Sequence, residues 1–356
     1  MTKESKGEVG FPGFERPWEK NDNDIWLAST ISLYRNIDKF HFPQKLSKEK
    51  RENISNLIVG VLKELDTLKN VQVFFGNSIS PLERDFLMEH FLIFDTARDS
   101  QNGQAYVTEQ TGRVLVQVNA HEHMQLHIVD PSGDLEGSLE QIFAVERGVE
   151  EKLPFAFSNT FGYLTSEASR CGTALLVQSF VHIPAIIQQG LYEEEIGKEE
   201  MEGVSFSGLR GDPHELIGDL LVVKNRWTVG LKEETILSSL RAAVMRVVDK
   251  ERTAREKIAR EKEEGLIDKM SRAIGTLQHA RTIDTKETLQ AMSLIKLAVE
   301  LGWIEGMSSE KINELFFDCR RAHLAKRLDK DLYASPKIHK ERADFLREVF
   351  APVRLT

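Results

Sequence analysis

Apolar and polar positions follow two different periods along this chain, and the period changes near Lys232. Before Lys232, several short segments alternate apolar and polar residues, which is the pattern of strands with one buried face. The strands predicted from this alternation cover 71–75, 105–108, 113–119 and 124–129. Two other segments, 47–65 and 80–92, carry apolar residues at helical spacing behind suitable starts at Ser47 and Ser80-Pro81. The first part of the chain is therefore predicted to be α+β.

The other apolar segments of this part have weaker patterns. Residues 25–34 are predicted to be a strand or a buried segment, and 135–152 an amphipathic helix. The run 173–186 is long and apolar, and its pattern does not separate helix from strand. Residues 217–229 predict two strands with Lys224-Asn225 between them.

From Lys232 almost to the end, the pattern is helical. Residues 249–263 are mostly charged, with opposite charges three or four positions apart, which predicts a solvated connecting helix; a basic partner site is the alternative. Further helices are predicted over 266–278, 285–302, 308–323 and 336–350. The change of pattern predicts an irregular lead-in over 1–23, a mixed domain over 24–245 and an all-helical domain over 246–356.

Composition narrows the classes of protein to consider. The chain has 356 residues and a net charge of −9, which disfavours a general nucleic-acid binder. No apolar run reaches the length of about 18 residues that a membrane span needs, and the polar N-terminus predicts no signal peptide. Cys171 and Cys319 make neither a disulfide framework nor a zinc site by themselves, so they favour a reducing cytoplasm.

Candidate chemistry gathers in one predicted turn between strands. His121 and His123 point to the same side of an extended segment, and His127 has the same parity. A zinc ion needs further ligands, and no second ligand cluster accompanies these histidines. We therefore predict no metal site and keep a metal-binding module as an alternative. Glu122 and Glu167 are candidate acid/base groups, but spacing alone selects no carboxylate pair.

Four stretches, read together, resemble the ATP:guanido phosphotransferase family. They are 29–36, 119–126, 161–185 and 209–215. The first resembles Ser-Arg-Ile-Arg-Leu-Ala-Arg-Asn, the second Asn-Glu-Glu-Asp-His-Leu-Arg-Ile, the third the Gly-Tyr-Leu-Thr-Ser block, and the fourth the Arg-Gly loop. Their order and separations match the family. The C-terminal helices resemble those of the bacterial protein-arginine kinase branch, and the resemblance covers roughly residues 18–350.

The resemblance implies a fold, a reaction and partners. The fold is a curved, mostly antiparallel sheet flanked by helices, followed by a helical domain that mediates dimerisation. The family transfers the γ-phosphoryl group of ATP, with Mg, to a guanidinium nitrogen, mostly by positioning and by neutralising phosphate charge. The expected partners are a second copy of the chain, a zinc-finger activator protein and a Clp-type AAA+ protease in the cytoplasm. Neither nucleic acid nor a membrane is expected.

The family's functional positions are largely replaced. Its nucleotide-binding positions fall on Ser29, Thr30, Ser32, Phe91, Gln125, Leu176, Arg210 and Glu215. Arginine is expected at Thr30, Ser32, Gln125 and Leu176, whereas Arg35 and Arg210 remain. The paired glutamates fall on Ala120 and His121 and the aspartate on Glu122, which makes His121 and Glu122 the catalytic candidates. The reactive cysteine of the family falls on Glu167.

The size of these losses decides between two interpretations of the resemblance. Charge-assisted hydrogen bonds contribute about 1.5–3 kcal/mol each, so losing four arginines removes on the order of 6–12 kcal/mol of triphosphate stabilisation. The sequence therefore favours a catalytically impaired homologue that acts as a scaffold or regulator. The alternative is a divergent active kinase. In it, His121 or Glu122 takes the role of the family's glutamate, and Arg210 together with lysines outside the matched positions holds ATP and Mg.

A last motif concerns phosphoarginine. Active relatives of this branch recognise phosphoarginine with a C-terminal Arg-Asp-x-x-Arg-Ala motif, which falls on 338–343. Only its second half survives here, with Arg342 as the remnant. Lys337 and Lys340 leave a basic face beside it, and an ordinary helix surface explains the pattern equally well.

Overall fold

The computed structural model describes residues 14–19, 23–94, 103–197, 203–328 and 332–356. Contacts divide the chain into two compact units that interleave along the sequence. The first unit comprises the residues up to Glu15, Ser32–Val129 and Gly137–Leu175, and the second comprises Arg16–Ile31, Asp130–Glu136 and Leu176–Thr356. The strands β1 (Trp26–Arg35) and β8 (Leu175–His182) contribute residues to both units.

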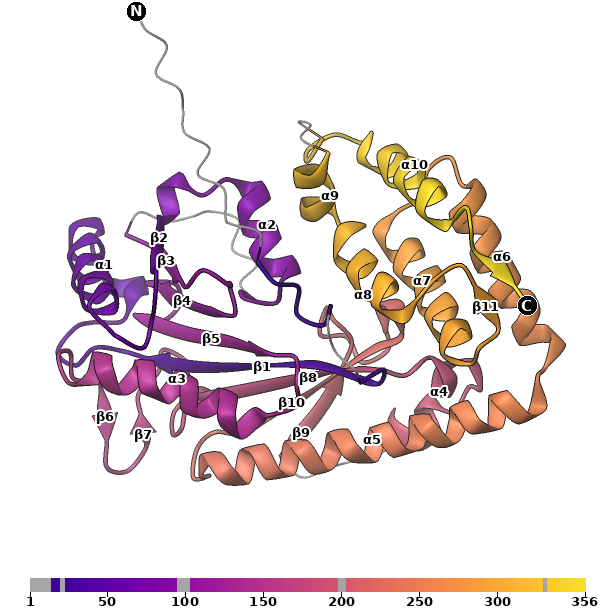
Figure 1. Cartoon of the computed structure of the whole chain (residues 1–356). Coiled ribbons are helices and arrows are strands. Elements are labelled where there is room, and N and C mark those ends of the chain that lie inside the picture. The colour runs from indigo at the N-terminus through magenta and orange to yellow at the C-terminus, as the bar shows by residue number, and fades with distance from the viewer. Residues whose placement is uncertain (1–13, 20–22, 95–102, 198–202, 329–331) are drawn as a thin grey trace, which may run out of the picture. The chain divides into compact units, whose positions relative to one another are not determined.

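An antiparallel sheet forms the centre of the first unit (Figure 1). Its strands lie in the order β2 (Gln72–Phe75), β3 (Ala105–Thr108), β4 (Val114–Val118), β5 (Met124–Asp130) and the second half of β1. Alternation of apolar residues sets the register, so that Val116 lies opposite Leu126 and both are fully buried. A small hairpin, β6 (Phe157–Ser158) and β7 (Gly162–Tyr163), extends this unit.

The helices of the first unit begin where the sequence offers caps. In α1 (Lys48–Lys63) the Ser47 side chain accepts from the Lys50 amide, and the helix packs on β3 and β4. In α2 (Pro81–Glu89) Ser80 and Glu83 form a reciprocal capping box. The third helix, α3 (Leu135–Glu150), lies mostly in this unit.

The second unit holds the remaining strands of the sheet. The first half of β1 neighbours β8, and β8 is followed by β10 (Leu220–Asn225) and the edge strand β9 (Val204–Ser207). The strand β10 pairs antiparallel with both neighbours, and Val223 lies opposite Ser179 of β8 and Phe206 of β9. The short helix α4 (Pro184–Gln188) follows β8, and the turn η5 (Ile217–Asp219) precedes β10.

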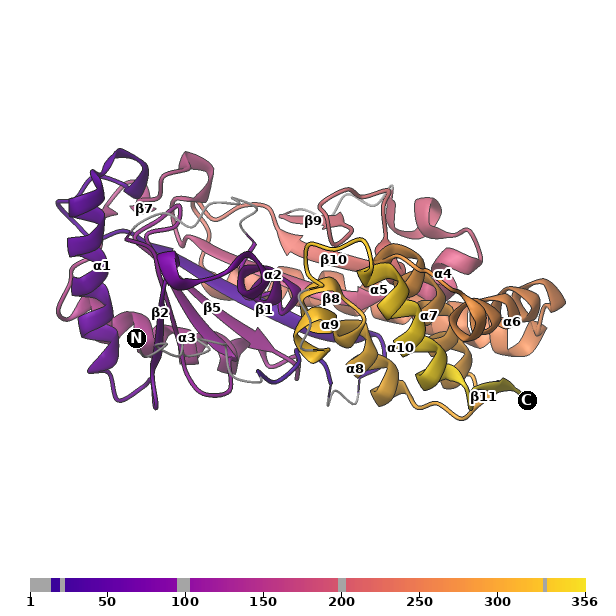
Figure 2. The ribbon, with the colours of Figure 1, turned by 90° about the horizontal axis from the view of Figure 1, so that it is seen from above.

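Helices make up most of the second unit. The long helix α5 (Glu233–Glu261) packs on β9, β10 and α4. The others are α6 (Glu264–His279), α7 (Thr285–Glu300), α8 (Ser309–Asp318), α9 (Arg321–Arg327) and α10 (Ile338–Phe350). Helix α6 packs mainly on α7 and α10 (Figure 2). The short strands β11 (Ile304–Glu305) and β12 (Arg354–Leu355) pair near the C-terminus.

The N-terminal segment of the second unit is fixed by one aromatic side chain. Trp18 is 1% exposed, and its ring lies 4.8 Å from the rings of both Phe316 and Phe317 and 5.8 Å from that of Phe180. Next to it, the Arg16 guanidinium donates to the Asp318 carboxylate at 2.6 Å. The predicted lead-in therefore contributes to the core, at least over its described residues.

The structure confirms the predicted α+β class and most predicted elements, and it resolves the ambiguous run 173–186 into a strand followed by the short helix α4. The prediction of two strands over 217–229 is wrong. Gly218 and Asp219 adopt left-handed φ angles of 65° and 51°, which makes a turn, and β10 ends at Asn225. The side-chain oxygen of Asn225 accepts from the Val177 amide, and its side-chain nitrogen donates to the Trp227 carbonyl, so side-chain bonds replace the strand ladder there.

The predicted helix over 308–323 is also wrong in one respect, because it is two helices. Arg320 has an extended backbone (φ −75°, ψ 160°), which ends α8 and starts α9. The predicted domain boundary near residue 245 lies within α5, and the two compact units do not follow chain order, so this boundary stays a prediction. Among the helices that the structure describes, none combines the length and apolar character needed to cross a bilayer.

Candidate functional site

The positions that match the family's site are divided between the two units. In the first unit they are His121, Glu122, Ser32, Phe91 and Gln125. In the second unit they are Ser29, Thr30, Leu176, Arg210, Glu215 and, near the C-terminus, Arg342. Each set has its own surroundings within its unit.

Glu122 is a buried carboxylate whose oxygens are occupied by neighbouring donors. It is 2% exposed. The Asn36 side-chain amide donates to it at 2.6 Å, the Ser166 hydroxyl at 2.6 Å and the Ser166 backbone amide at 3.0 Å. These bonds connect the turn before β5 with the segment after β7. Glu122 is therefore placed as a structural acceptor, and its role as an acid/base group stays a prediction.

Asn36 organises the same part of the first unit. Its side-chain oxygen accepts from the His123 amide at 2.9 Å, and its side-chain nitrogen also donates to the Leu164 carbonyl at 3.0 Å. His123 Nδ1 accepts from the Ile37 amide at 3.1 Å, so in the neutral ring Nε2 carries the proton. Burial lowers the pKa of His123 to about 4, which keeps this ring neutral.

Neutral side chains surround Ser32, the position in the first unit at which the first motif of the family has an arginine. Ser32 is fully buried, and its hydroxyl lies 2.7 Å from His127 Nδ1. Burial lowers the pKa of His127 to about 3. Gln125 lies two residues earlier on β5, opposite Gln117 of β4, and its side-chain nitrogen is buried without a hydrogen-bond partner. This face of β5 carries polar but uncharged groups.

Arg35 is the remaining arginine of the first motif, and its guanidinium is committed to structure. Its Nε bonds to the Glu146 carboxylate at 2.6 Å, and its Nη1 donates to the carbonyls of Tyr34 and Thr173. The guanidinium carbon lies 3.5 Å from the centre of the Tyr163 ring. With 1% exposure, Arg35 fixes the end of β1.

Phe91 and His121, two further matched positions of the first unit, differ in burial. Phe91 is buried just after α2 with a left-handed φ of 58°. His121 is exposed in the turn before β5, and its carbonyl accepts from the Gln44 side chain at 3.0 Å. The structure thus separates His121, at the surface, from His123 and His127, in the interior. Among the described residues, no three histidine, cysteine, aspartate or glutamate side chains are arranged to hold a metal ion.

Uncharged groups also occupy the matched positions on β1 and β8 in the second unit. The Ser29 hydroxyl lies 2.8 Å from the Ser179 hydroxyl and accepts from the Trp26 indole at 3.0 Å. Thr30 is buried, and its hydroxyl has no hydrogen-bond partner. Leu176 is half-buried.

The Arg-Gly loop of the second unit is a tight turn at the surface. The Gly208 amide donates to the Asp212 carbonyl at 2.8 Å, and Gly211 has a φ of 87° that favours glycine. Arg210 is exposed within this turn. Glu215 pairs with Lys286 of α7 at 2.6 Å, a contact that sequence reasoning missed because Lys286 lies outside every motif.

Arg342 is a buried structural arginine of α10. Its Nε donates to the Cys319 carbonyl at 2.6 Å, and its Nη1 donates to the Ile283 carbonyl at 2.9 Å. It is 1% exposed and satisfies carbonyls at the end of α8 and before α7. Its assignment as a phosphoarginine-site remnant stays a prediction.

The matched positions do not fit a magnesium triphosphate. Such a ligand needs several cationic donors around its oxygens. Arg35 is buried against Glu146, and Arg210 is the exposed arginine among the matched positions that the structure describes. The other side chains at the matched nucleotide positions are hydroxyl, amide, apolar or acidic. These side chains therefore support no reaction step through ATP.

Comparison with known proteins gives the chain its relatives. Residues 53–254 match the family model described as ATP:guanido phosphotransferase, C-terminal catalytic domain, and residues 263–355 match the model of the protein-arginine kinase McsB C-terminal domain. A protein-arginine kinase of Chlamydia pneumoniae is 33% identical over 329 residues, covering 91% of this chain and 90% of the relative. A protein-arginine kinase of Halothermothrix orenii is 29% identical over 311 residues, covering 87% and 89%.

Solved structures show the same fold at lower identity. A duplicated taurocyamine kinase from Schistosoma mansoni with bound transition-state-analogue components matches with a TM-score of 0.58 and 20% identity. The match covers 68% of this chain and 35% of that longer chain. A lombricine kinase matches with a TM-score of 0.56 and 15% identity, covering 69% and 73%. These likenesses support the predicted guanido kinase fold.

Proposed function

We propose that this chain, which belongs to the ATP:guanido phosphotransferase family, is a catalytically impaired member of it, a pseudokinase. Its homologues are the protein-arginine kinases. The family activity is transfer of a phosphoryl group from ATP. In this chain the protein surfaces of the kinase would be kept while the transfer chemistry is lost. Its function would then be that of a scaffold or regulator in protein quality control.

The observation that carries this proposal is the neutral character of the matched phosphate positions. Thr30 and Ser32 are buried hydroxyls, and Gln125 is a buried amide. Without arginines at these three positions and at Leu176, the triphosphate would lose on the order of 6–12 kcal/mol of stabilisation, at about 1.5–3 kcal/mol for each of four charge-assisted bonds. Glu122, at an acidic position of the family motif, already accepts bonds from Asn36 and Ser166, which leaves it poorly suited to deprotonate a guanidinium.

The proposed partners follow from membership of the protein-arginine kinase branch. They are a second copy of the chain, a zinc-finger activator protein and a Clp-type AAA+ protease, all in the cytoplasm. A scaffold of this kind needs its folded surfaces but no nucleotide. We therefore expect association with these partners to be independent of ATP and Mg.

A divergent active kinase is the second candidate, and one observation favours it. Arg210 is exposed, and Lys286, which is half exposed, pairs with Glu215, five positions after Arg210 in the chain. These two cations would be available to phosphate oxygens if Glu215 released Lys286. In that case Arg210→Ala and Lys286→Ala would each abolish nucleotide binding.

Two measurements separate the candidates. Transfer of radiolabelled phosphate from ATP to arginine side chains of a protein substrate is measured beside the Chlamydia pneumoniae relative as the positive control. Calorimetric titration with ATP and Mg at millimolar concentration measures binding directly. We expect neither transfer nor binding. Turnover comparable to that of the relative, lost in Arg210→Ala, would establish the active kinase instead.

A further inference from the structure

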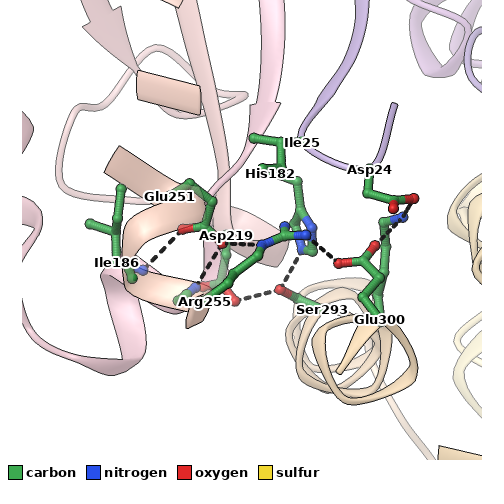
Figure 3. Close-up of polar contacts among 12 residues, drawn as sticks. Asp24, Ile25, His182, Ile186, Asp219, Glu251, Arg255, Ser293 and Glu300 are labelled. Carbon is green, nitrogen blue, oxygen red and sulfur yellow. Dashed lines mark hydrogen bonds and ion pairs between the residues drawn. The ribbon is translucent and has the colours of Figure 1, made fainter. Parts of the chain in front are cut away.

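A single connection in the second unit links β8 to β10, and its two ends meet. The connection starts with α4 and ends with η5, and the Ile183 amide donates to the Asp219 carbonyl at 2.9 Å, which joins them. Between these ends lie β9 and the exposed turn with Arg210. Figure 3 shows that both ends are approached by side chains of one polar cluster.

At the first end, a carboxylate of α5 caps α4. The Glu251 oxygens accept from the Ala185 amide at 3.1 Å and the Ile186 amide at 3.0 Å. These amides have no partner inside their own helix, because the first turn of a helix leaves its donors unsatisfied. Glu251 is fully buried, and its carboxylate ties the first turn of α4 to α5 (Figure 3).

At the second end, helix α7 holds η5. Asp219 accepts from the Gln290 side chain at 2.8 Å and from the Ser293 hydroxyl. The Gln290 oxygen in turn accepts from the Gly218 amide at 3.2 Å. Ser293 also lies 2.8 Å from His182 Nε2, and because Ser293 donates to Asp219, His182 Nε2 is the donor to Ser293.

Buried ion pairs join α5 and α7, the two helices that hold these ends. Arg255 of α5 bonds to Glu251 at 2.8 Å and to Glu300 of α7 at 2.5 Å. Lys296 of α7 lies 2.8 Å from Glu300 and 3.9 Å from Asp24, which is half exposed. His182 of β8 lies in the same cluster (Figure 3).

The charges of this cluster do not balance. Its buried carboxylates are Asp219, Glu251 and Glu300, and its cations are Arg255 and Lys296. With a neutral His182, one negative charge is left over among these buried groups, and the half-exposed Asp24 beside Lys296 adds a second. An excess charge in a poorly hydrated interior is unfavourable unless it binds a proton or becomes hydrated.

We propose that this cluster is a proton-binding clamp, which holds both ends of the β8–β10 connection when it carries an extra proton and releases them more readily when that proton is lost. In the clamp, Glu251 holds α4 on α5, Asp219 joins η5 to α7, and the Arg255–Glu300 pair joins α5 to α7. The clamp sets how firmly the connection that carries Arg210 and Glu215 is held. It does not depend on whether the chain binds a nucleotide.

The direction of the effect follows from linkage. Burial raises the pKa of Glu251 to about 7 and that of Asp219 to about 6. Opening the clamp hydrates both carboxyls and returns their pKa values to about 4, so opening releases protons between those limits. Opening is therefore opposed at low pH and becomes easier as the pH rises towards 7. Burial, with Lys296 and Arg255 nearby, lowers the pKa of His182 far below its usual range, so this ring acts in the opposite direction below about pH 6.5.

The test is amide hydrogen exchange of the full chain between pH 5 and pH 8, corrected for intrinsic exchange rates. The readout is the protection of α4 and η5 amides in the wild type divided by that in Glu251→Gln, which cancels the contribution of His182. We expect this ratio to fall by up to about tenfold per pH unit from pH 5 to pH 7, as release of one proton requires, and to level off above pH 7.

Glu256→Gln is the matched control, since Glu256 lies on the same helix but is exposed. Its ratio to the wild type should stay flat across the pH range. Asp219→Asn supplies a second ratio, which should fall from pH 5 to pH 6, and it decides the question if Glu251→Gln does not fold. Ratios that are flat for both Glu251→Gln and Asp219→Asn would overturn the clamp.

Discussion

Asn36 and Glu122 are separated by 86 positions in the chain, yet the Asn36 side-chain amide donates a 2.6 Å hydrogen bond to the Glu122 carboxylate inside the first unit. Ser166, a further 44 positions along the chain from Glu122, completes the arrangement with its hydroxyl and its amide. This three-part contact occupies the carboxylate at the family's aspartate position. Glu122 was a catalytic candidate in the sequence, and in the structure its carboxylate accepts hydrogen bonds that hold distant segments together.

Replacing Glu122 should destabilise the first unit. Glu122→Ala removes the acceptor of the buried Asn36 side chain and of the half-buried Ser166, for a loss of about 2–6 kcal/mol at roughly 1–3 kcal/mol for each of these two residues. Urea unfolding measures the change. Glu167→Ala is the control, because Glu167 is about half exposed and pairs with Arg170 at the surface. Equal stability of Glu122→Ala and the wild type would contradict the buried contact.

The buried pair of Arg35 and Glu146 predicts a second loss of stability. Arg35→Ala leaves the Glu146 carboxylate uncompensated in the interior, which typically destabilises a protein by about 3–5 kcal/mol. Arg170→Ala removes an exposed pair and should change the free energy of unfolding by less than about 1 kcal/mol. If Arg35 instead served phosphate binding, Arg35→Ala would leave the unfolding midpoint of the isolated protein close to that of the wild type.

The buried histidines of β5 and its turn predict acid sensitivity. The pKa of His127 is lowered to about 3 by burial, whereas an unfolded histidine titrates near 6.5. The unfolded state therefore binds more protons below pH 6.5, and stability is lost as the pH falls, by about 1.4 kcal/mol per pH unit for this group. Urea midpoints at pH 7, 6 and 5 should show a shallower pH dependence in His127→Gln.

The exposed His121 provides the control for this effect. His121→Gln should keep the pH dependence of the wild type, because the His121 ring is exposed in the turn before β5 and is not desolvated by folding. A pH dependence that is the same in His127→Gln and His121→Gln would mean that His127 is not held neutral by burial.

The N-terminal segment should stabilise the second unit through Trp18. Trp18→Ala removes a ring packed among Phe180, Phe316 and Phe317, and we expect a loss of about 3–5 kcal/mol. Trp227 is 53% exposed, so Trp227→Ala should change stability by less than about 0.5 kcal/mol. Thermal and urea unfolding of the two variants compare the same substitution in two environments. Similar losses in both would refute the anchoring role of Trp18.

Local sequence determined much of the fold. The helix that begins after Ser47 and the one that begins after Ser80-Pro81 were predicted from their caps and apolar spacing, because both signals act over a few residues. The strands β3, β4 and β5 followed from alternation for the same reason. The break at Arg320 and the turn at Gly218-Asp219 were missed because no such local signal marks them. Both depend on backbone angles that tertiary packing sets.

The sequence by itself also determined the family, since motif order and residue identity carry that assignment. The replacement of the family's arginines stays a prediction from the same matched positions. Only the tertiary structure decided what the surviving polar residues do. Arg35, Glu122 and Arg342 are chemically suited to phosphate or guanidinium, but their partners are buried groups far along the chain. Burial and hydrogen bonding arise from contacts between distant segments, and residue spacing does not encode them.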